Sequence, residues 1–346
     1  MKQNLLASRI ASFDICKGFC ILNVILGHQF EKNGLHQPLQ FIQTFHMPLF
    51  FMIAGYFISD RISMKEFSKR RAKRLLIPYA VSCLIVAILC AVVVLLKKLD
   101  IESVWRELLK RLWISLYGSG CGHGSLIGKM GTEAEIGMMW YLIALLWSSI
   151  VVKAVSENKM AGIITIMISS VAIGTTMIFG WIPFSIQNGM AVVIWVWLGY
   201  YVKKKDLLSD ILKFIRSPWI LLVFVSWILS AVYGCTHLYG NYYKLGFVDM
   251  VGAVAGSILI FGFCSFLDKK IFWIKKNLTW IGANSLLIYC LHFAENNVCP
   301  ISSVVKKMGF TKPFGSALIS WIIISMIACL VASLLRKLKI VRTIYG

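Results

Sequence analysis

Acidic residues are scarce in this chain. Its 346 residues include 15 Asp and Glu against 36 Lys and Arg, which gives a formal net charge of +21. In a soluble protein such an excess would suggest nucleic-acid binding. Here 58% of the residues are hydrophobic, well above the soluble norm, and the basic residues lie mainly in short loops between apolar runs. That distribution is typical of membrane proteins and argues against nucleic acid as a partner.

Several other signals are missing. No ten-residue segments alternate between apolar and polar side chains, which excludes a transmembrane barrel. The ten cysteines have no CxxC or His-rich companion, so we interpret them as small apolar filling and expect no metal site. The start, MKQNLLASRIASFD, lacks an apolar core followed by a cleavage site, so we interpret it as a mature cytoplasmic N-terminus. No internal repeat and no soluble domain are detectable.

The chain contains many long runs of apolar residues. Runs of roughly 18 to 23 residues match the thickness of a bilayer core. They predict an all-α, polytopic helix bundle in which residues 1–346 form a single membrane domain. We expect about ten transmembrane helices, at residues 13–30, 39–59, 75–97, 137–155, 161–180, 181–202, 218–236, 247–267, 278–298 and 315–336.

The distribution of basic residues predicts the orientation. With the N-terminus inside, 24 of the 36 Lys and Arg fall in cytoplasmic segments and 11 outside, with Lys17 left inside the first span. This bias favours an inner (plasma) membrane protein with both termini in the cytoplasm.

One outer connection, residues 97–136, carries more positive charge than such loops usually do. Part of it repeats apolar residues at helical spacing, which predicts an amphipathic helix lying in the membrane interface. The glycine-rich GSGCGHGSLIGKMG that follows has no Walker-type Lys-Ser/Thr pair, so we interpret it as a loop and not a phosphate cradle. The roles of Glu133 and Glu135 just after it are left open.

The first span, FDICKGFCILNVILGHQF, carries ionisable side chains that a membrane segment tolerates poorly. Lys17 and His28 are eleven residues apart, about 16 Å of helix and close to three full turns, so they share a side. Asp14 lies one turn before Lys17. A structural Asp–Lys pair with one packed histidine is one interpretation. The other is a general base, His28, facing a polar cavity in which Lys17 holds negative charge.

The second basic feature is the RRAKR cluster at residues 70–74. Positive-inside topology alone explains many such loops. Arg71 and Arg74 nevertheless share a helix face, and two guanidinium groups on one face can clamp a phosphate. In the preceding FHMPLFFMIAGYF, Pro48 is expected to disrupt a helix beside a cavity. His46 is then either a cavity-lining residue or a satisfied structural histidine.

Further polar and aromatic residues mark later spans. Ser285, Tyr289 and His292 fall on one helical face in the ninth span, where such residues can equally be packing contacts. The role of Glu295 is left open. His36, His123 and His237 are expected to need no explanation beyond solvation. The remaining candidate lining residues are Trp140, Tyr141 and Asn284.

Taken together, these pieces resemble the acyltransferase 3 family of bacterial integral-membrane acyltransferases, especially its fucose 4-O-acetylase-like branch. The matching segments occur in the family's order and are FDICKGFCILNVILGH, FHMPLFFMIAGYF, KRRAKRLLIPY, MMWYLIALL and SLLIYCLHF. The family's basic-X10-His motif falls on Lys17 and His28, and its Arg-x-x-Arg motif on Arg71 and Arg74. The basic position is often Arg in the family and is Lys here. Many members add a soluble esterase-like domain, which this sequence does not contain.

The resemblance implies that an acyl group, usually acetyl, passes from cytoplasmic acyl-CoA to a hydroxyl of a sugar or glycan outside. It makes acetyl-CoA a donor substrate, with no permanently bound cofactor. Lys17, Arg71 and Arg74 would bind the donor. His28, with Asp14, would be catalytic and could deprotonate the acceptor hydroxyl or briefly carry the acyl group itself. Tyr289, Trp140 or Asn284 could supply the oxyanion donor that acyl transfer needs.

Our main hypothesis is therefore a membrane-bound O-acetyltransferase acting on a cell-envelope or exported polysaccharide or its lipid-linked precursor. A glycan or lipid flippase is the first alternative, and it predicts inverted repeats with broken helices in matching halves. A non-catalytic membrane sensor or scaffold is the second. It would need neither the histidine nor the arginine pair.

Overall fold

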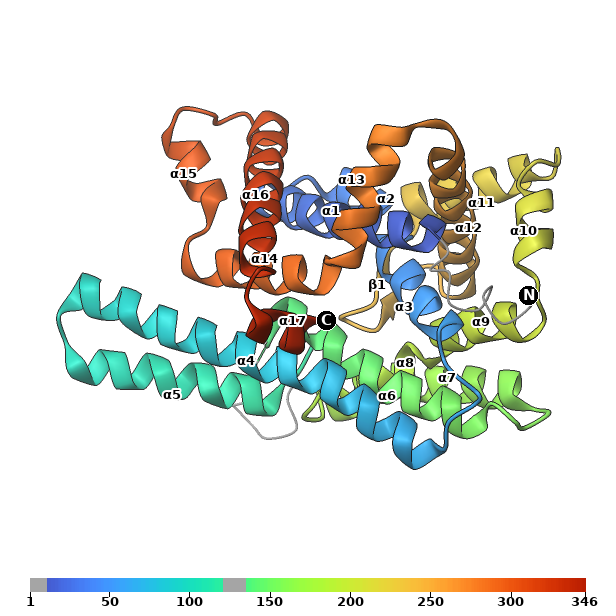
Figure 1. The fold of residues 1–346 in the computed structure, drawn as a ribbon, viewed down its shortest axis with the longest axis horizontal. Helices are drawn as coiled ribbons and strands as arrows, with labels where there is room; N and C mark the ends of the chain where they lie inside the picture. Colours follow the sequence, from blue (N-terminus) through green and yellow to red (C-terminus); the bar gives the residue numbers. More distant parts are fainter. Residues whose placement is uncertain (1–10, 121–134) are drawn as a thin grey trace.

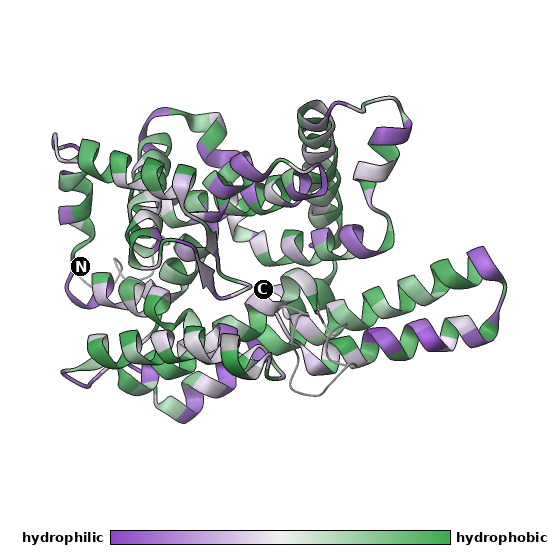
Figure 2. Ribbon diagram, turned by 180° about the vertical axis from the view of Figure 1, so that it is seen from behind, coloured by the Kyte–Doolittle hydropathy of each residue, from purple (hydrophilic) through white to green (hydrophobic). Residues whose placement is uncertain are grey.

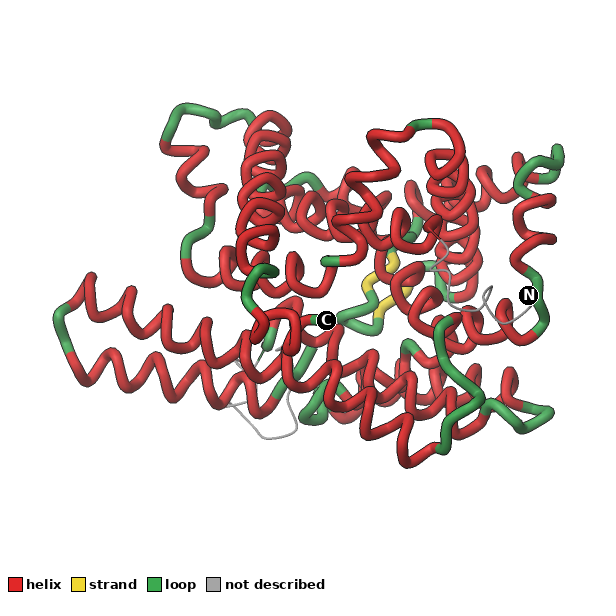
Figure 3. Tube along the Cα trace, viewed as in Figure 1, coloured by secondary structure: helices red, strands yellow, loops and turns green. Residues whose placement is uncertain are grey.

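The computed structural model describes residues 11–120 and 135–346, and these are almost entirely helical (Figures 1 and 3). The all-α prediction is confirmed. Within the described residues the only paired strands are β1 (Thr236–His237) and β2 (Tyr242–Tyr243). They pair antiparallel, with Thr236 opposite Tyr243. The regular structure is therefore a helix bundle with one very short hairpin.

Most of the helices form two groups that face each other (Figure 1). The first comprises α4 (Met64–Lys98), α5 (Ile101–Tyr117), α6 (Trp140–Val155), α7 (Ala161–Phe179), α8 (Ile186–Ala191) and α9 (Val193–Lys204). The second comprises α1 (Ala11–Lys32), α11 (Ile220–Tyr233), α12 (Phe247–Lys270), α13 (Phe272–Ala283), α14 (Ser285–Val298) and α16 (Pro313–Leu335).

Short helices complete the two groups and connect them. These are α2 (His36–Gln43), α3 (His46–Tyr56), the single turn η2 (Gly137–Met139), α10 (Leu208–Phe214), α15 (Ile301–Lys307) and α17 (Lys339–Tyr345). Helix α3 packs on both α1 and α9, and α14 packs on both α4 and α16. Helices α3 and α14 therefore connect the two helix groups.

Five of the described helices are long and apolar enough to cross a membrane: Ala11–Lys32, Met64–Lys98, Gly137–Val155, Phe247–Lys270 and Pro313–Leu335. Two shorter apolar helices, Ala161–Thr176 and Ile220–Tyr233, accompany them. Apolar residues run along α4, and hydrophilic ones gather at the tip of the α4–α5 hairpin (Figure 2). The helices are those of a membrane protein, whereas the expected count of about ten spans stays a prediction.

Three of the expected spans are broken into two helices each. Residues 39–59 divide into α2 and α3, residues 181–202 contain α8 and α9, and residues 278–298 divide at Asn284 into α13 and α14. The expectation that Pro48 itself disrupts a helix is wrong. Helix α3 begins at His46, so Pro48 lies in the first turn, where its missing N–H removes no helical hydrogen bond.

Helix-capping residues set the α4–α5 hairpin. Ser63 accepts a hydrogen bond from the backbone N–H of Glu66, which starts α4. Asp100 accepts from the N–H groups of Glu102 and Ser103 and starts α5 immediately after α4 ends. Helix α5 is the expected amphipathic helix. Residues 121–131 of the glycine-rich loop, with His123, and Glu133 lie outside the described residues.

Glycines let helix backbones touch at two crossings. A Cβ on Gly282 of α13 would lie 1.7 Å from the carbonyl oxygen of Asp14 in α1. One on Gly199 of α9 would lie 1.8 Å from the carbonyl oxygen of Met52 in α3. Small residues at such crossings are the usual way in which membrane helices approach closely, because van der Waals packing drives their association. The two contacts bring α13 against α1 and α9 against α3 at backbone distance.

We expect Gly199→Ala to lower the free energy of unfolding by about 2 kcal/mol, because the added methyl group collides with rigid backbone. The measurement is the thermal midpoint of the purified protein in one detergent. Gly174→Ala in α7 is the matched control, since its Cβ would meet no atom within 4 Å. Equal thermal midpoints for Gly199→Ala and Gly174→Ala would show that α3 and α9 can move apart at this crossing without loss of stability.

Candidate active site

One polar cavity between the helix groups, called here the cationic cavity, has a volume of about 720 Å3. Its walls come from α1, α3, α4, α6, α13, α14 and α17. The charged side chains among its lining residues are Asp14, Lys17, Arg71, Arg74 and Arg336. Four cations and one carboxylate give this lining a clear excess of positive charge.

Arg71 and Arg74 are presented by the first half of α4. That helix begins at Met64, so both arginines are helical and both line the cationic cavity. Arg71 is half-buried and donates from Nε and Nη2 to the hydroxyl oxygen of Ser149, at 3.2 and 2.9 Å. Arg74 is exposed to the cavity mouth. One guanidinium is thus fixed against α6 and the other is open to a ligand.

Lys17 and Asp14 form an ion pair on α1, with 2.6 Å between Nζ and Oδ1. The Asp14 side chain is 3% exposed and that of Lys17 23% exposed, so the carboxylate lies behind the ammonium as seen from the cavity. Asp14 precedes His28 by about 21 Å of helix. The structure therefore pairs Asp14 with Lys17 and does not place it beside His28.

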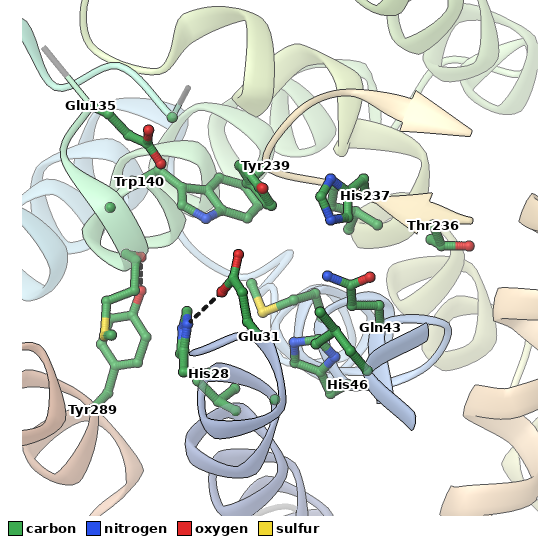
Figure 4. A pocket seen from close by; sticks show the side chains of 18 residues that line it. His28, Glu31, Gln43, His46, Glu135, Trp140, Thr236, His237, Tyr239 and Tyr289 are labelled. Carbon is green, nitrogen blue, oxygen red and sulfur yellow. Dashed lines mark hydrogen bonds and ion pairs between the residues drawn. The ribbon is translucent and has the colours of Figure 1, made fainter. Parts of the chain in front are cut away.

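The second space, called here the histidine cavity, has a volume of about 130 Å3 (Figure 4). It is bounded by α1, α2, α3, the η2 turn, α14 and the β1–β2 hairpin. Its polar and aromatic lining residues are His28, Glu31, Gln43, His46, Glu135, Trp140, Thr236, His237, Tyr239 and Tyr289. Imidazole, carboxylate and indole groups from distant parts of the chain thus converge on one space.

His28 is oriented by a carboxylate on its own helix. Its Nδ1 lies 3.3 Å from Oε2 of Glu31, one turn later in α1 (Figure 4). A carboxylate can only accept, so this contact places the ring proton on Nδ1 and leaves Nε2 as the basic nitrogen. The pair has the composition of a histidine base with a carboxylate that holds its tautomer.

Two more histidines reach the same cavity. His46 donates from Nδ1 to the carbonyl oxygen of Ile42 at 2.6 Å, which leaves its Nε2 as an acceptor. His237 is half-buried in β1. Burial lowers the pKa of His237, and the nearby Glu31 carboxylate partly offsets this, so the ring is neutral at neutral pH. The expectation that His237 needs no explanation beyond solvation is wrong, whereas His36 is indeed exposed at the start of α2.

The hairpin that carries His237 is held by buried polar side chains. Asp249, fully buried in α12, accepts hydrogen bonds from the backbone N–H groups of Cys235 and Leu245, at 3.2 and 2.7 Å. Asn188 of α8 donates to the carbonyl oxygen of Tyr239 at 2.7 Å. Two helices from opposite groups therefore position the hairpin across the histidine cavity.

The two cavities adjoin. Val24, Met47 and Tyr289 line both of them. These three side chains therefore form the boundary that the two cavities share. Because Lys17 and His28 lie on the same side of α1, one helix serves both spaces.

A second histidine–carboxylate pair lies behind the first. His292 of α14 is fully buried, and its Nδ1 lies 3.1 Å from Oε2 of Glu295. The rings of His292 and His28 are 5.5 Å apart between centroids. His292 does not line either cavity, so it is placed to support His28 and not to contact a substrate directly.

The three candidate oxyanion donors differ in availability. Tyr289 already donates its hydroxyl proton to the carbonyl oxygen of Met138. Asn284 donates from Nδ2 to Trp280 and accepts from Arg336, and it lines neither cavity. Trp140 lines the histidine cavity and shows no indole hydrogen bond to another described residue (Figure 4). Its N–H is the one most open to a ligand.

Sequence reasoning placed most candidates near one of the two spaces and missed others. Tyr141 lines the cationic cavity as a neighbour of Arg71. Glu31 was missed, although its spacing of three from His28 on a helix was a usable signal. Arg336 was missed because it lies in a basic loop that topology already explains. Within the described residues no group of His, Cys, Asp and Glu side chains has a metal-binding arrangement.

Comparison with known proteins adds a family match. The profile of the family described as "Acyltransferase domain" matches residues 10–336. Nodulation protein NolL of Mesorhizobium japonicum is 28% identical over 177 residues, 48% of this chain and 41% of that protein. Nodulation protein NolL of Sinorhizobium fredii is 36% identical over 90 residues, 23% of this chain and 25% of that protein. The matches thus span less than half the length of these relatives. No solved structure matches.

Proposed function

The chain belongs to the acyltransferase family, and from that membership we propose that it is a membrane O-acyltransferase, most simply an O-acetyltransferase. The donor is acyl-CoA, bound in the cationic cavity from the cytoplasm. The acceptor is a hydroxyl of a cell-envelope or exported sugar or polysaccharide, bound in the histidine cavity from the other side of the plasma membrane. The observation that carries the proposal is the junction of two chemically different cavities at Val24, Met47 and Tyr289.

The charge of the cationic cavity supports a phosphorylated donor. Coenzyme A carries a diphosphate and a further phosphate, and guanidinium groups bind such oxyanions through paired, charge-assisted hydrogen bonds. Arg71 and Arg74 project from one helix face into the cavity. The flexible arm of the donor can then run along α1 toward His28, so that the thioester reaches the junction.

The lining of the histidine cavity supports a hydroxyl-bearing acceptor. Trp140 and Tyr239 offer aromatic faces on which a sugar ring can pack, and Gln43, Glu135 and Thr236 offer hydrogen-bonding groups. A neutral imidazole next to a carboxylate is also the usual means of activating a hydroxyl at neutral pH. The same lining would be a poor site for a purely apolar cargo.

The proposed reaction is direct transfer between two bound substrates. Nε2 of His28 removes the acceptor hydroxyl proton as the oxygen attacks the thioester carbonyl carbon. The C–S bond then breaks, the acyl ester is formed, and the CoA thiolate recovers the proton from His28. Because the cavities adjoin, both substrates can be present together, and no covalent acyl-histidine is required. Trp140 donates from its indole N–H to the oxyanion that develops on the carbonyl oxygen.

We expect His28→Ala to reduce the release of CoA from acetyl-CoA at least about 100-fold, because the general base is removed. Acetyl-CoA affinity should be unchanged, since the arginines lie in the other cavity. The measurement is CoA release and acetyl-CoA binding by protein in nanodiscs, with a panel of sugar acceptors. His36→Ala, an exposed histidine, is the control. Near-normal turnover in His28→Ala would remove His28 from the mechanism.

We expect Arg74→Ala to weaken acetyl-CoA binding about tenfold, because one charge-assisted contact to phosphate is lost. The difference from wild type should narrow as salt rises, since salt screens the attraction. Arg70→Ala is the matched control, because Arg70 is exposed on the same helix and paired with Glu66. If the wild type binds no acyl-CoA at all, the assignment of acyl-CoA as donor is wrong, and the result supports the flippase alternative.

We expect Trp140→Phe to lower kcat about 100-fold while leaving the acetyl-CoA dissociation constant unchanged, because only the transition state uses the indole N–H. The control is Trp219→Phe at the start of α11, where the indole is exposed and lines neither cavity. A wild-type kcat in Trp140→Phe would assign the oxyanion donor to another group.

A further inference from the structure

Arg336 is a cation of the cationic cavity that lies outside both family motifs. It follows the last residue of α16 and is half-buried. Its Nη1 donates to Oδ1 of Asn284, and its Nη2 donates to a main-chain oxygen of Gly346, the last residue of the printed sequence, at 2.7 Å. The Asn284 partner is an uncharged amide oxygen, so this contact orients the guanidinium without neutralising its charge.

The break between α13 and α14 holds this arginine in place. Asn284 is 4% exposed, and its Nδ2 donates to the carbonyl oxygen of Trp280 at 2.7 Å. The amide is therefore fixed, with its oxygen turned toward Arg336. A guanidinium has five N–H donors, and these two contacts use two of them. Arg336 is positioned and still has donors for a ligand.

The charge balance of the cavity makes this arginine significant. The only carboxylate among the lining side chains, Asp14, is already paired with Lys17. Arg71 is bonded to a neutral hydroxyl, that of Ser149. Three guanidinium groups, two from α4 and one from the end of α16, thus line one cavity, and none of them is paired with an Asp or Glu side chain of that lining. Such a set is suited to a ligand with several phosphate charges.

We propose that Arg336 is a third phosphate-binding arginine of the donor site, acting with Arg71 and Arg74 from a different element of the cavity wall. The inference rests on the proposed function, because it takes the phosphates to be those of acyl-CoA. Arg336 keeps its bond to Asn284 and offers its remaining N–H groups to a phosphate oxygen. The α17 segment next to it, through Tyr345, forms the adjoining wall.

The test compares Arg336→Gln with Arg342→Gln, an exposed arginine of α17 that does not line the cavity. Dissociation constants are measured in phosphatidylcholine nanodiscs for acetyl-CoA, for its 3′-dephospho form and for S-acetylpantetheine, which has no phosphate. We expect Arg336→Gln to weaken acetyl-CoA binding about tenfold, with S-acetylpantetheine binding unchanged. Arg342→Gln should match wild type, and Arg336→Lys should recover part of the affinity.

Each of the remaining outcomes would contradict the proposal and would indicate a different role for Arg336 or for the cavity. Equal acetyl-CoA affinity in Arg336→Gln and wild type would show that Arg336 does not bind the donor. An equal loss for all three thioesters would show that Arg336 only supports the cavity wall. If anionic lipid weakens acetyl-CoA binding to wild type but not to Arg336→Gln, the phosphate it binds is that of a lipid. If the wild type binds none of the thioesters, the donor assignment itself fails.

Discussion

The charged side chains of α1 have to be kept away from lipid, and the arrangement of the surrounding helices follows from that constraint. An apolar medium makes an exposed ionised group costly, so a helix with Asp14, Lys17, His28 and Glu31 needs protein or enclosed water around it. Helices α3, α12, α13, α14 and α16 all pack against α1. The backbone contact at Gly282 allows α13 to approach so closely that the polar side of α1 is left facing the space between the two helix groups.

Broken helices give that space its chemistry. A break exposes backbone groups and redirects side chains, and it is tolerated at membrane depth only beside protein or a water-filled cavity. The α2–α3 break brings His46 to the histidine cavity, and the α13–α14 break brings Asn284 to Arg336. Guanidinium and ammonium groups gather in one space and imidazole groups in the next, and Tyr289 lines both. Such a separation suits transfer between two substrates that arrive from different sides.

Helical spacing explains why part of the site could be predicted. Lys17 and His28, or Arg71 and Arg74, lie on single helices, so their relative placement follows from the residues per turn. Glu31 could have been found by the same rule. His237 and Arg336 could not, because each lies in a connection whose position depends on distant contacts: Asp249 and Asn188 hold the hairpin, and Asn284 holds the arginine. Local pattern carries no information about such contacts.

The sequence by itself determined the all-α membrane class, the family, and the order of the polar motifs, because apolar run length and helical periodicity are local properties. Only the tertiary structure decided that Asp14 pairs with Lys17 while Glu31 orients His28, and that two cavities meet at Val24, Met47 and Tyr289. It also showed that three expected spans are broken. These features depend on which helices pack against one another. Helix packing is set by how side chains fit together over the whole chain, and the residues next to any one position in the sequence do not determine it.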